Sequence, residues 1–164
     1  MGKEKTQKYN LFKEYQITHH SFVDMMDLLK SIPKWFNDHQ YYAYEIKASE
    51  KDIGTGGELE SNWAGSRDVT DYIKFHIELF VHARDLKQVI LEDGTETYWA
   101  RLVIRYSCKL EKNYQKTFKD TFFQNLIREL YERYYLIPNV VRGYEGKLFI
   151  ESNSLFDTLK AHLK

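Results

Sequence analysis

The side chains best suited to chemistry in this chain are its histidines and its single cysteine, and their spacing does not assemble a catalytic centre. His76 and His82 share one face of a predicted strand, where a rise of roughly 3.3 Å per residue separates them by about 20 Å. Two ligands of one zinc ion lie much closer together, because each binds at about 2 Å from the metal. Cys108 occupies an apolar position of a second predicted strand, where a thiol is usually inert packing. We therefore expect no catalytic residue, no metal ion and no cofactor.

A glycine-rich segment, Gly54-Thr-Gly56-Gly57, is the one sequence that could cradle a phosphate. The dinucleotide fingerprint requires glycine at the first, third and sixth positions, and the sixth position here is Leu59. The other phosphate-binding loop requires Gly-Lys-Ser or Gly-Lys-Thr, which does not follow. We interpret the segment as a turn between two strands.

Basic and aromatic side chains are interleaved on one predicted strand face. Arg101, Arg105 and Lys109 share that face, with Trp99 beside them, and such an arrangement can bind single-stranded nucleic acid. The chain has 24 Lys and Arg against 24 Asp and Glu, so it lacks the net positive field of a general nucleic-acid binder. Glu78 is placed to pair with Lys109 on the same face. We interpret the face as a solvated sheet surface and do not expect nucleic acid as a partner.

A long β-hairpin within Val69–Glu111 positions most of these side chains. Apolar and polar residues alternate along both arms, which is typical of strands with one buried and one solvated face. Asp93-Gly94 suits a two-residue turn, because both central residues need positive φ. Pairing Glu92 with Thr95 then sets Leu79 opposite Cys108 on the buried face. The apolar positions of the two arms are Ile73, Phe75, Ile77, Leu79, Val81 and Ala83, then Tyr98, Ala100, Leu102, Ile104, Tyr106, Cys108 and Leu110.

The solvated face of this hairpin tests the predicted pairing. It brings Glu78 to Lys109 and His76 to Glu111, and opposite charges across strands stabilise a sheet by roughly 0.2–1 kcal/mol. Charged residues at two apolar-face positions within Arg84–Gln88 break the alternation. They predict a bulge, or a division into two shorter strands, at that point.

The remaining elements follow from shorter patterns. A stripe of Phe118, Phe122, Leu126, Leu130 and Tyr134 at four-residue steps predicts a long helix over Thr117–Leu136 that Pro138 ends. Further strands are expected at Tyr9–Ile17, Tyr41–Ser49, Leu59–Ala64 and Lys147–Glu151, and further helices at 22–32, Lys34–His39 and 153–163, with a turn at Gly143–Gly146.

Length and composition predict one domain over residues 1–164, with a frayed lead-in at 1–8 and a C-terminal extension at 139–164. The fold class is α+β: an antiparallel sheet built on the long central hairpin and packed against a long C-terminal helix. No apolar run approaches the roughly 18 residues of a membrane span. The single cysteine and the charged N-terminal residues, which lack the apolar core of a signal peptide, favour a cytoplasmic protein.

The order of these elements resembles the helix-grip architecture of START-type domains over residues 9–137. In that architecture a curved sheet wraps a C-terminal helix, and the resemblance implies a space between the two that often takes an apolar ligand. We expect this space to be lined by Phe75, Ile77, Leu79, Tyr106, Phe122, Leu126, Leu130 and Tyr134.

Four functions are open at this point. The first is a non-enzymatic binding module that holds a small apolar ligand between sheet and long helix; a solid core without a pocket is the structural alternative. The second is an interaction protein that uses the charged, aromatic sheet face for a protein partner or for another copy of itself. A nucleic-acid module ranks third. An enzyme ranks fourth, because no acid, base or nucleophile stands out.

Overall fold

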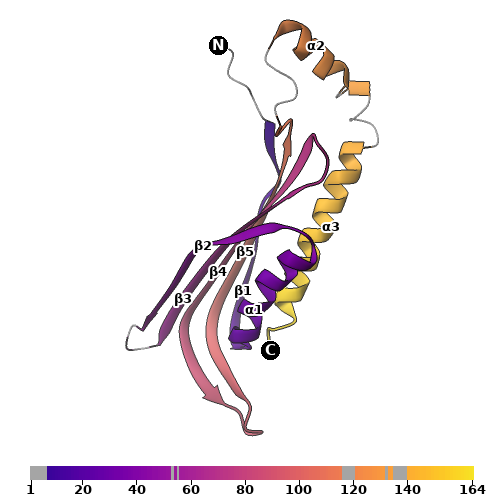
Figure 1. Cartoon of the computed structure of the whole chain (residues 1–164). Helices are drawn as coiled ribbons and strands as arrows, with labels where there is room; N and C mark the ends of the chain where they lie inside the picture. Colours follow the sequence, from indigo (N-terminus) through magenta and orange to yellow (C-terminus); the bar gives the residue numbers. More distant parts are fainter. Residues whose placement is uncertain (1–6, 53, 55, 116–120, 132, 135–139) are drawn as a thin grey trace.

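A computed structural model describes residues 7–52, 54, 56–115, 121–131, 133–134 and 140–164 (Figure 1). Five antiparallel strands form one sheet in the order β1-β5-β4-β3-β2, so the first strand pairs with the last. The expected α+β class with an antiparallel sheet and a C-terminal helix is confirmed. The elements are β1 Gln7–Val23, α1 Met25–Asp38, β2 Tyr42–Asp52, β3 Gly57–Asp68, β4 Ile73–Ile90, β5 Glu96–Lys112, α2 Phe122–Tyr131 and α3 Val140–Lys160.

The predicted central hairpin is β4 and β5, and its cross-strand pairing is shifted by two residues from the prediction. Leu79 pairs with Tyr106, and Cys108 pairs with Ile77. One residue of the shift arises at the turn, because Ile90 pairs with Glu96 and the turn takes in all of residues 91–95.

The second residue of the shift arises at a bulge between Arg84 and Lys87, within the segment where the sequence predicts one. Asp85 lies there with a φ of 52°, the left-handed conformation that lets the strand absorb an extra residue. A shift of two preserves the alternation of faces. Leu79 and Cys108 are therefore both buried on the same face, at 2% and 0% exposure, although they are not direct partners.

Both charge contacts predicted for the solvated face are present. Lys109 Nζ lies 2.6 Å from Glu78 Oε1, and His76 Nε2 lies 2.6 Å from Glu111 Oε2. With the shifted pairing these partners are diagonal neighbours rather than directly opposite, and their long side chains span the extra distance.

The core lies between one face of the sheet and the helices α1 and α3, which Figure 1 shows together on that side. Helix α1 is continuous through Pro33, so the predicted break into two helices is wrong. Its first turn begins after Asp24, and residues 18–23, expected partly as helix, belong to β1. Its buried stripe is Met25, Leu28, Ile32, Trp35 and Phe36, the spacing of one helical face.

The segment after residue 139 departs most from the sequence prediction. It forms helix α3 in place of the expected turn, short strand and small helix, and it supplies the core rather than an extension. Gly143 and Gly146 are turn-forming residues in isolation, but burial of Leu148, Leu155 and Leu159 against the sheet stabilises the helix. None of the helices in the described part of the chain is long and apolar enough to cross a membrane.

Candidate functional site

A cleft of about 460 Å³ opens between helix α1 and the hairpin of β2 and β3. Figure 1 shows that the end of β2 and the start of β3 lie apart from α1. The cleft thus lies where α1 stops covering the sheet. It is lined by Met26, Leu29, Lys30, Pro33, Glu45, Ala48, Ser49, Glu50, Leu59, Glu60, Ser61 and Trp63.

The helical wall of the cleft is a second apolar stripe on α1. Met26, Leu29 and Pro33 follow one another at three- and four-residue steps, so they share a face that is rotated from the buried stripe. Met26 remains 56% exposed, which is high for a large apolar side chain. Leu29 is partly buried and packs against the core, while Met26 and Pro33 are exposed at the cleft.

The sheet wall combines apolar side chains with a short polar chain. Leu59, Ser61 and Trp63 alternate along β3 with the inward parity, and Ser61 is only 4% exposed. The Trp63 indole N–H donates to Ser61 Oγ at 2.9 Å, and the Ser61 hydroxyl donates to Glu45 Oε1 at 2.5 Å. Glu45 reaches this wall because it pairs with Trp63 immediately before a bulge in β2.

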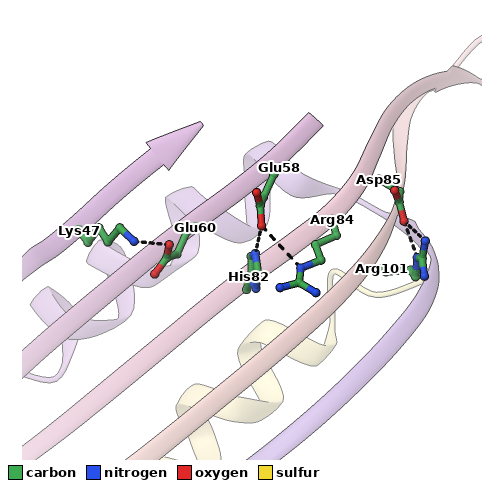
Figure 2. Close-up of polar contacts among 7 residues, drawn as sticks. All are labelled: Lys47, Glu58, Glu60, His82, Arg84, Asp85 and Arg101. Atoms are coloured by element: carbon green, nitrogen blue, oxygen red, sulfur yellow. Dashed lines mark hydrogen bonds and ion pairs between the residues drawn. The ribbon is translucent and has the colours of Figure 1, made fainter. Parts of the chain in front are cut away.

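Glu60 of β3 lies near the cleft, but its side chain is on the opposite face of the sheet. Glu60 forms an ion pair with Lys47 at 2.5 Å on the side of the sheet away from α1 and α3 (Figure 2). The hydrogen bond from Lys47 lowers the pKa of the Glu60 carboxyl. The carboxylates on the cleft side are therefore those of Glu45 and Glu50, which pair with Trp63 and Leu59 of β3.

The eight residues expected to line a pocket are not brought together. The four strand residues, Phe75, Ile77, Leu79 and Tyr106, lie under α3 at 0–2% exposure and belong to the packed core. Tyr106 packs its ring 4.7 Å from that of Phe156 and donates its hydroxyl to Asn153, both on α3. The position expected for the 117–136 helix is thus occupied by α3.

The four helical residues of the expected pocket lie at the surface instead. Phe122, Leu126, Leu130 and Tyr134 are 88%, 46%, 49% and 73% exposed. Their stripe is helical as predicted between Phe122 and Tyr131, and Phe118 lies outside the described residues. Tyr131 of α2 contacts Tyr72, with ring centres 5.9 Å apart and the ring planes nearly perpendicular.

The opposite face of the sheet carries paired charges rather than a cluster of free bases. Figure 2 shows Glu58 between His82, at 2.7 Å, and Arg84, at 3.6 Å. The hydrogen bond with His82 lowers the pKa of the Glu58 carboxyl. The three basic residues considered for nucleic acid each contact a carboxylate: Arg101 with Asp85, Arg105 with Glu14 at 3.7 Å, and Lys109 with Glu78 at 2.6 Å.

A buried polar cluster that the sequence does not reveal joins α3 to the sheet. Arg67 Nη2 on β3 lies 2.8 Å from both carboxylate oxygens of Glu151 on α3, and Tyr41 donates its hydroxyl to the same carboxylate at 2.8 Å. Arg67 also donates to the carbonyl of His39. Burial raises the pKa of the Tyr41 phenol well above its ordinary value. These contacts join α3 to β3 and to the segment that follows α1.

The other candidates for chemistry in the sequence are Cys108, the histidines and the glycine-rich segment. Burial raises the pKa of the Cys108 thiol to about 12, so it is not a nucleophile at neutral pH. Within the described residues, no three His, Cys, Asp or Glu side chains lie close enough to hold a metal ion. Gly54-Thr-Gly56-Gly57 falls at the turn between β2 and β3, with residues 53 and 55 outside the described set.

Comparisons with known proteins identify no family. No family model and no curated protein matches the chain. Among solved structures, the chain is similar to an uncharacterised protein from Rhizobium leguminosarum, with 10% identity over 96% of this chain and 99% of that one and a TM-score of 0.22. A likeness of that size indicates neither an architecture nor an activity.

Proposed function

We propose that the protein is a non-enzymatic binding module that holds a small ligand with an apolar body in the cleft between α1 and the β2–β3 hairpin. The observation that carries this proposal is the apolar stripe of Met26, Leu29 and Pro33, which lines one open cleft together with Leu59 and Trp63. Small-molecule sites are typically concave, mostly apolar and furnished with a few polar groups, and range over about 300–1,000 Å³. At about 460 Å³ the cleft falls in that range.

We extend the proposal to the architecture and regard the chain as a short helix-grip domain. The packing of the C-terminal helix α3 across one face of the sheet supports this, as does the pairing of the first strand with the last. Under this proposal the ligand enters at the side of the gripped helix. The space directly beneath α3 is filled by core side chains such as Phe75 and Ile77. Under this proposal the ligand therefore binds in the cleft beside α1 instead.

A pair of tryptophan substitutions tests the site. Ala48→Trp places a large ring in the cleft and is expected to abolish binding of a decyl-chain probe. Leu126→Trp on the exposed face of α2 is the matched control and is expected to leave the affinity unchanged. Calorimetric titration of wild type and both variants gives the comparison. Loss of binding only in Leu126→Trp would place the ligand at α2 and reject the cleft.

A second candidate function is self-association through the sheet face that α1 and α3 leave open. Tyr42 and Tyr44 are 77% and 55% exposed beside Ile46 at 60%, on the edge strand β2. Adjacent exposed apolar side chains of this kind commonly mark an interaction surface. Sedimentation of the wild type across a concentration series is expected to show a dimer, and Tyr44→Glu is expected to dissociate it. A wild type that stays monomeric at the highest concentration would exclude this function.

A further inference from the structure

We propose that the cleft beside α1 selects an amphipathic cation, a ligand that combines an apolar chain with an ammonium or similar donor group. This inference rests on the proposed function, since it names the chemical class of the ligand at that same site. It excludes fatty acids as preferred ligands, because their carboxylate has the wrong charge for the cleft.

The two polar side chains that β3 presents to the cleft, Ser61 and Trp63, have no donor left for a ligand. Ser49 of β2 also lines the cleft, but it pairs with Glu60, whose side chain is on the opposite face. Ser61 has a single hydroxyl proton, which it donates to Glu45 Oε1. The Trp63 indole N–H is taken up by Ser61 Oγ. The hydrogen-bonding capacity left at this point belongs to the Glu45 carboxylate, which accepts up to about four hydrogen bonds and donates none. A ligand head group that meets it must therefore donate.

The charges of the cleft also favour a cationic head group. Within the described residues, neither Glu45 nor Glu50 has a basic side chain within 4.0 Å. Lys47 of β2 is on the other face of the sheet, where it forms an ion pair with Glu60. Lys30 of α1 lines the cleft, but its side chain is 72% exposed and its Nζ lies 3.9 Å from Asp27 Oδ1. The sheet side of the cleft thus presents uncompensated negative charge beside apolar walls.

Trp63 adds a second attraction for a cation. It pairs directly with Glu45 across β2 and β3, so their Cβ atoms are neighbours on the cleft side at roughly 4.5–5.5 Å. One face of the indole stacks on Phe36, with ring centres 6.4 Å apart, which fixes the orientation of the ring in the wall. An ammonium at the Glu45 carboxylate lies beside this ring, and aromatic faces attract cations. The apolar chain then extends along Met26 and Leu29.

Three ligands with the same decyl chain test the inference: decylammonium, decanol and decanoate. Each is titrated calorimetrically into the full-length protein at low and moderate salt, below the concentration at which it forms micelles. Charge-assisted hydrogen bonds stabilise by more than neutral ones, so decylammonium is expected to bind about tenfold more tightly than decanol, and decanoate more weakly than either. The preference for the amine is expected to shrink as salt rises.

Two glutamate variants locate the effect. Glu45→Gln keeps the shape and can still accept from Ser61, so decanol affinity is expected to stay constant while the preference for decylammonium falls to within about threefold. Glu78→Gln removes a carboxylate from the opposite face of the sheet and is expected to retain the full preference. Both substitutions are at exposed side chains, and the three-ligand comparison in the wild type gives a result that needs no variant.

The outcomes separate this inference from the proposed function. Equal binding of the three ligands, or a preference for decanoate, overturns the cationic selectivity and leaves an apolar binding module. A preference for decylammonium that is unchanged in Glu45→Gln also overturns the inference, because the selectivity then comes from elsewhere. Failure of all three ligands to bind the wild type overturns the inference and the proposed function together.

Discussion

Arg67 and Glu151 are 84 residues apart in sequence and form an ion pair in which Nη2 lies 2.8 Å from each carboxylate oxygen. Their side chains are only 16% and 14% exposed, so the pair joins α3 to β3 within the packed part of the fold. Removing one member of a buried pair leaves the other without a partner, which usually costs more than the pair itself contributed.

Glu151→Ala is therefore expected to lower the free energy of unfolding by about 3–5 kcal/mol, because it strands the Arg67 guanidinium. Lys109→Ala, which breaks the exposed pair with Glu78, is expected to cost less than about 1 kcal/mol. Urea unfolding of both variants measures the difference. Equal losses in the two variants would show that the Arg67–Glu151 pair is solvated like a surface pair.

The two C-terminal helices give a matched test of which one is gripped by the sheet. Leu155→Ala on α3 removes a side chain that is 1% exposed and is expected to cost about 2–5 kcal/mol. Leu130→Ala on α2 removes one that is 49% exposed and is expected to change stability by less than about 1 kcal/mol. If denaturant unfolding shows a larger loss of stability for Leu130→Ala than for Leu155→Ala, then α2, and not α3, is the helix that packs in the core.

Glycine substitutions test the contact between α1 and β3. A Cβ at Gly65 meets Phe36 Cε1 at 2.4 Å, so Gly65→Ala is expected to destabilise the protein by about 1–3 kcal/mol as that ring is displaced. Gly146 on α3 has open space around its Cα, and Gly146→Ala is expected to stabilise by about 0.5–1 kcal/mol through helix propensity. Thermal unfolding of the two alanine variants should move in opposite directions. Two shifts of the same sign would contradict the packing of Phe36 on Gly65.

Alkaline pH is expected to destabilise the fold through Cys108. Burial raises the pKa of this thiol from 9.0 to about 12 in the folded protein, so above pH 9 the unfolded chain releases a proton that the folded one retains. The contribution of Cys108 to the free energy of unfolding is therefore fully present below pH 9. Between pH 9 and pH 12 the free energy of unfolding falls by about 1.4 kcal/mol per pH unit. Burial also raises the pKa of Tyr106 to about 12, which adds to the loss above pH 10.

The control for this pH effect is Cys108→Ala, measured by urea unfolding at pH 8, 9 and 10. The variant lacks the thiol and is expected to show a flatter profile between pH 9 and pH 10, whatever its stability at neutral pH. Alkylation by iodoacetamide gives a second readout, because a buried thiol reacts only when the protein opens. A wild-type profile as flat as that of the variant would mean that Cys108 titrates normally.

The faces of the central hairpin were predictable from sequence, whereas its pairing was not. Period-two alternation assigns Leu79 and Cys108 to the buried face whatever the turn length, so long as any shift is even. The turn over residues 91–95 and the bulge at Asp85 each add one residue, and both depend on backbone conformations that no residue type enforces alone. Counting outward from a two-residue turn at Asp93-Gly94 therefore assigns Leu79 and Cys108 to the correct face of the sheet but gives each the wrong cross-strand partner.

For the helices, the sequence pattern indicates which residues share a face but not where that face packs. The stripe that includes Phe122 and Leu126 is a genuine helical pattern, yet its face is exposed, because a periodic pattern says what a segment can bury and not where it packs. In α3 the apolar residues surround the helix, with Ile150 69% exposed opposite the buried Leu148. Two glycines further weakened its helical signal. Tertiary packing decided the structure of that segment.

The candidate site was the least predictable part of the chain. Its signal was available on α1, where Met26, Leu29 and Pro33 form a second apolar stripe beside the fully buried one. Reading Pro33 as the end of one helix divided that stripe and concealed it. The contribution of Glu45 depends on a bulge in β2, which alternation over Tyr41–Ser49 did not indicate.

The pairing of β1 with β5 also constrains when the fold can be completed. Gln7 pairs with Lys112 and Val23 with Tyr98, so the first strand has its sheet partner only after the whole central hairpin has been synthesised. Until then β4, β3 and β2 can assemble as successive local hairpins, while the segment Gln7–Val23 waits as an unpaired strand. Closing such long loops makes folding slower than in helical proteins of similar size. During synthesis, the N-terminal segment is thus the one most prone to incorrect strand pairing. This is the segment whose binding by a chaperone would prevent the most misfolding.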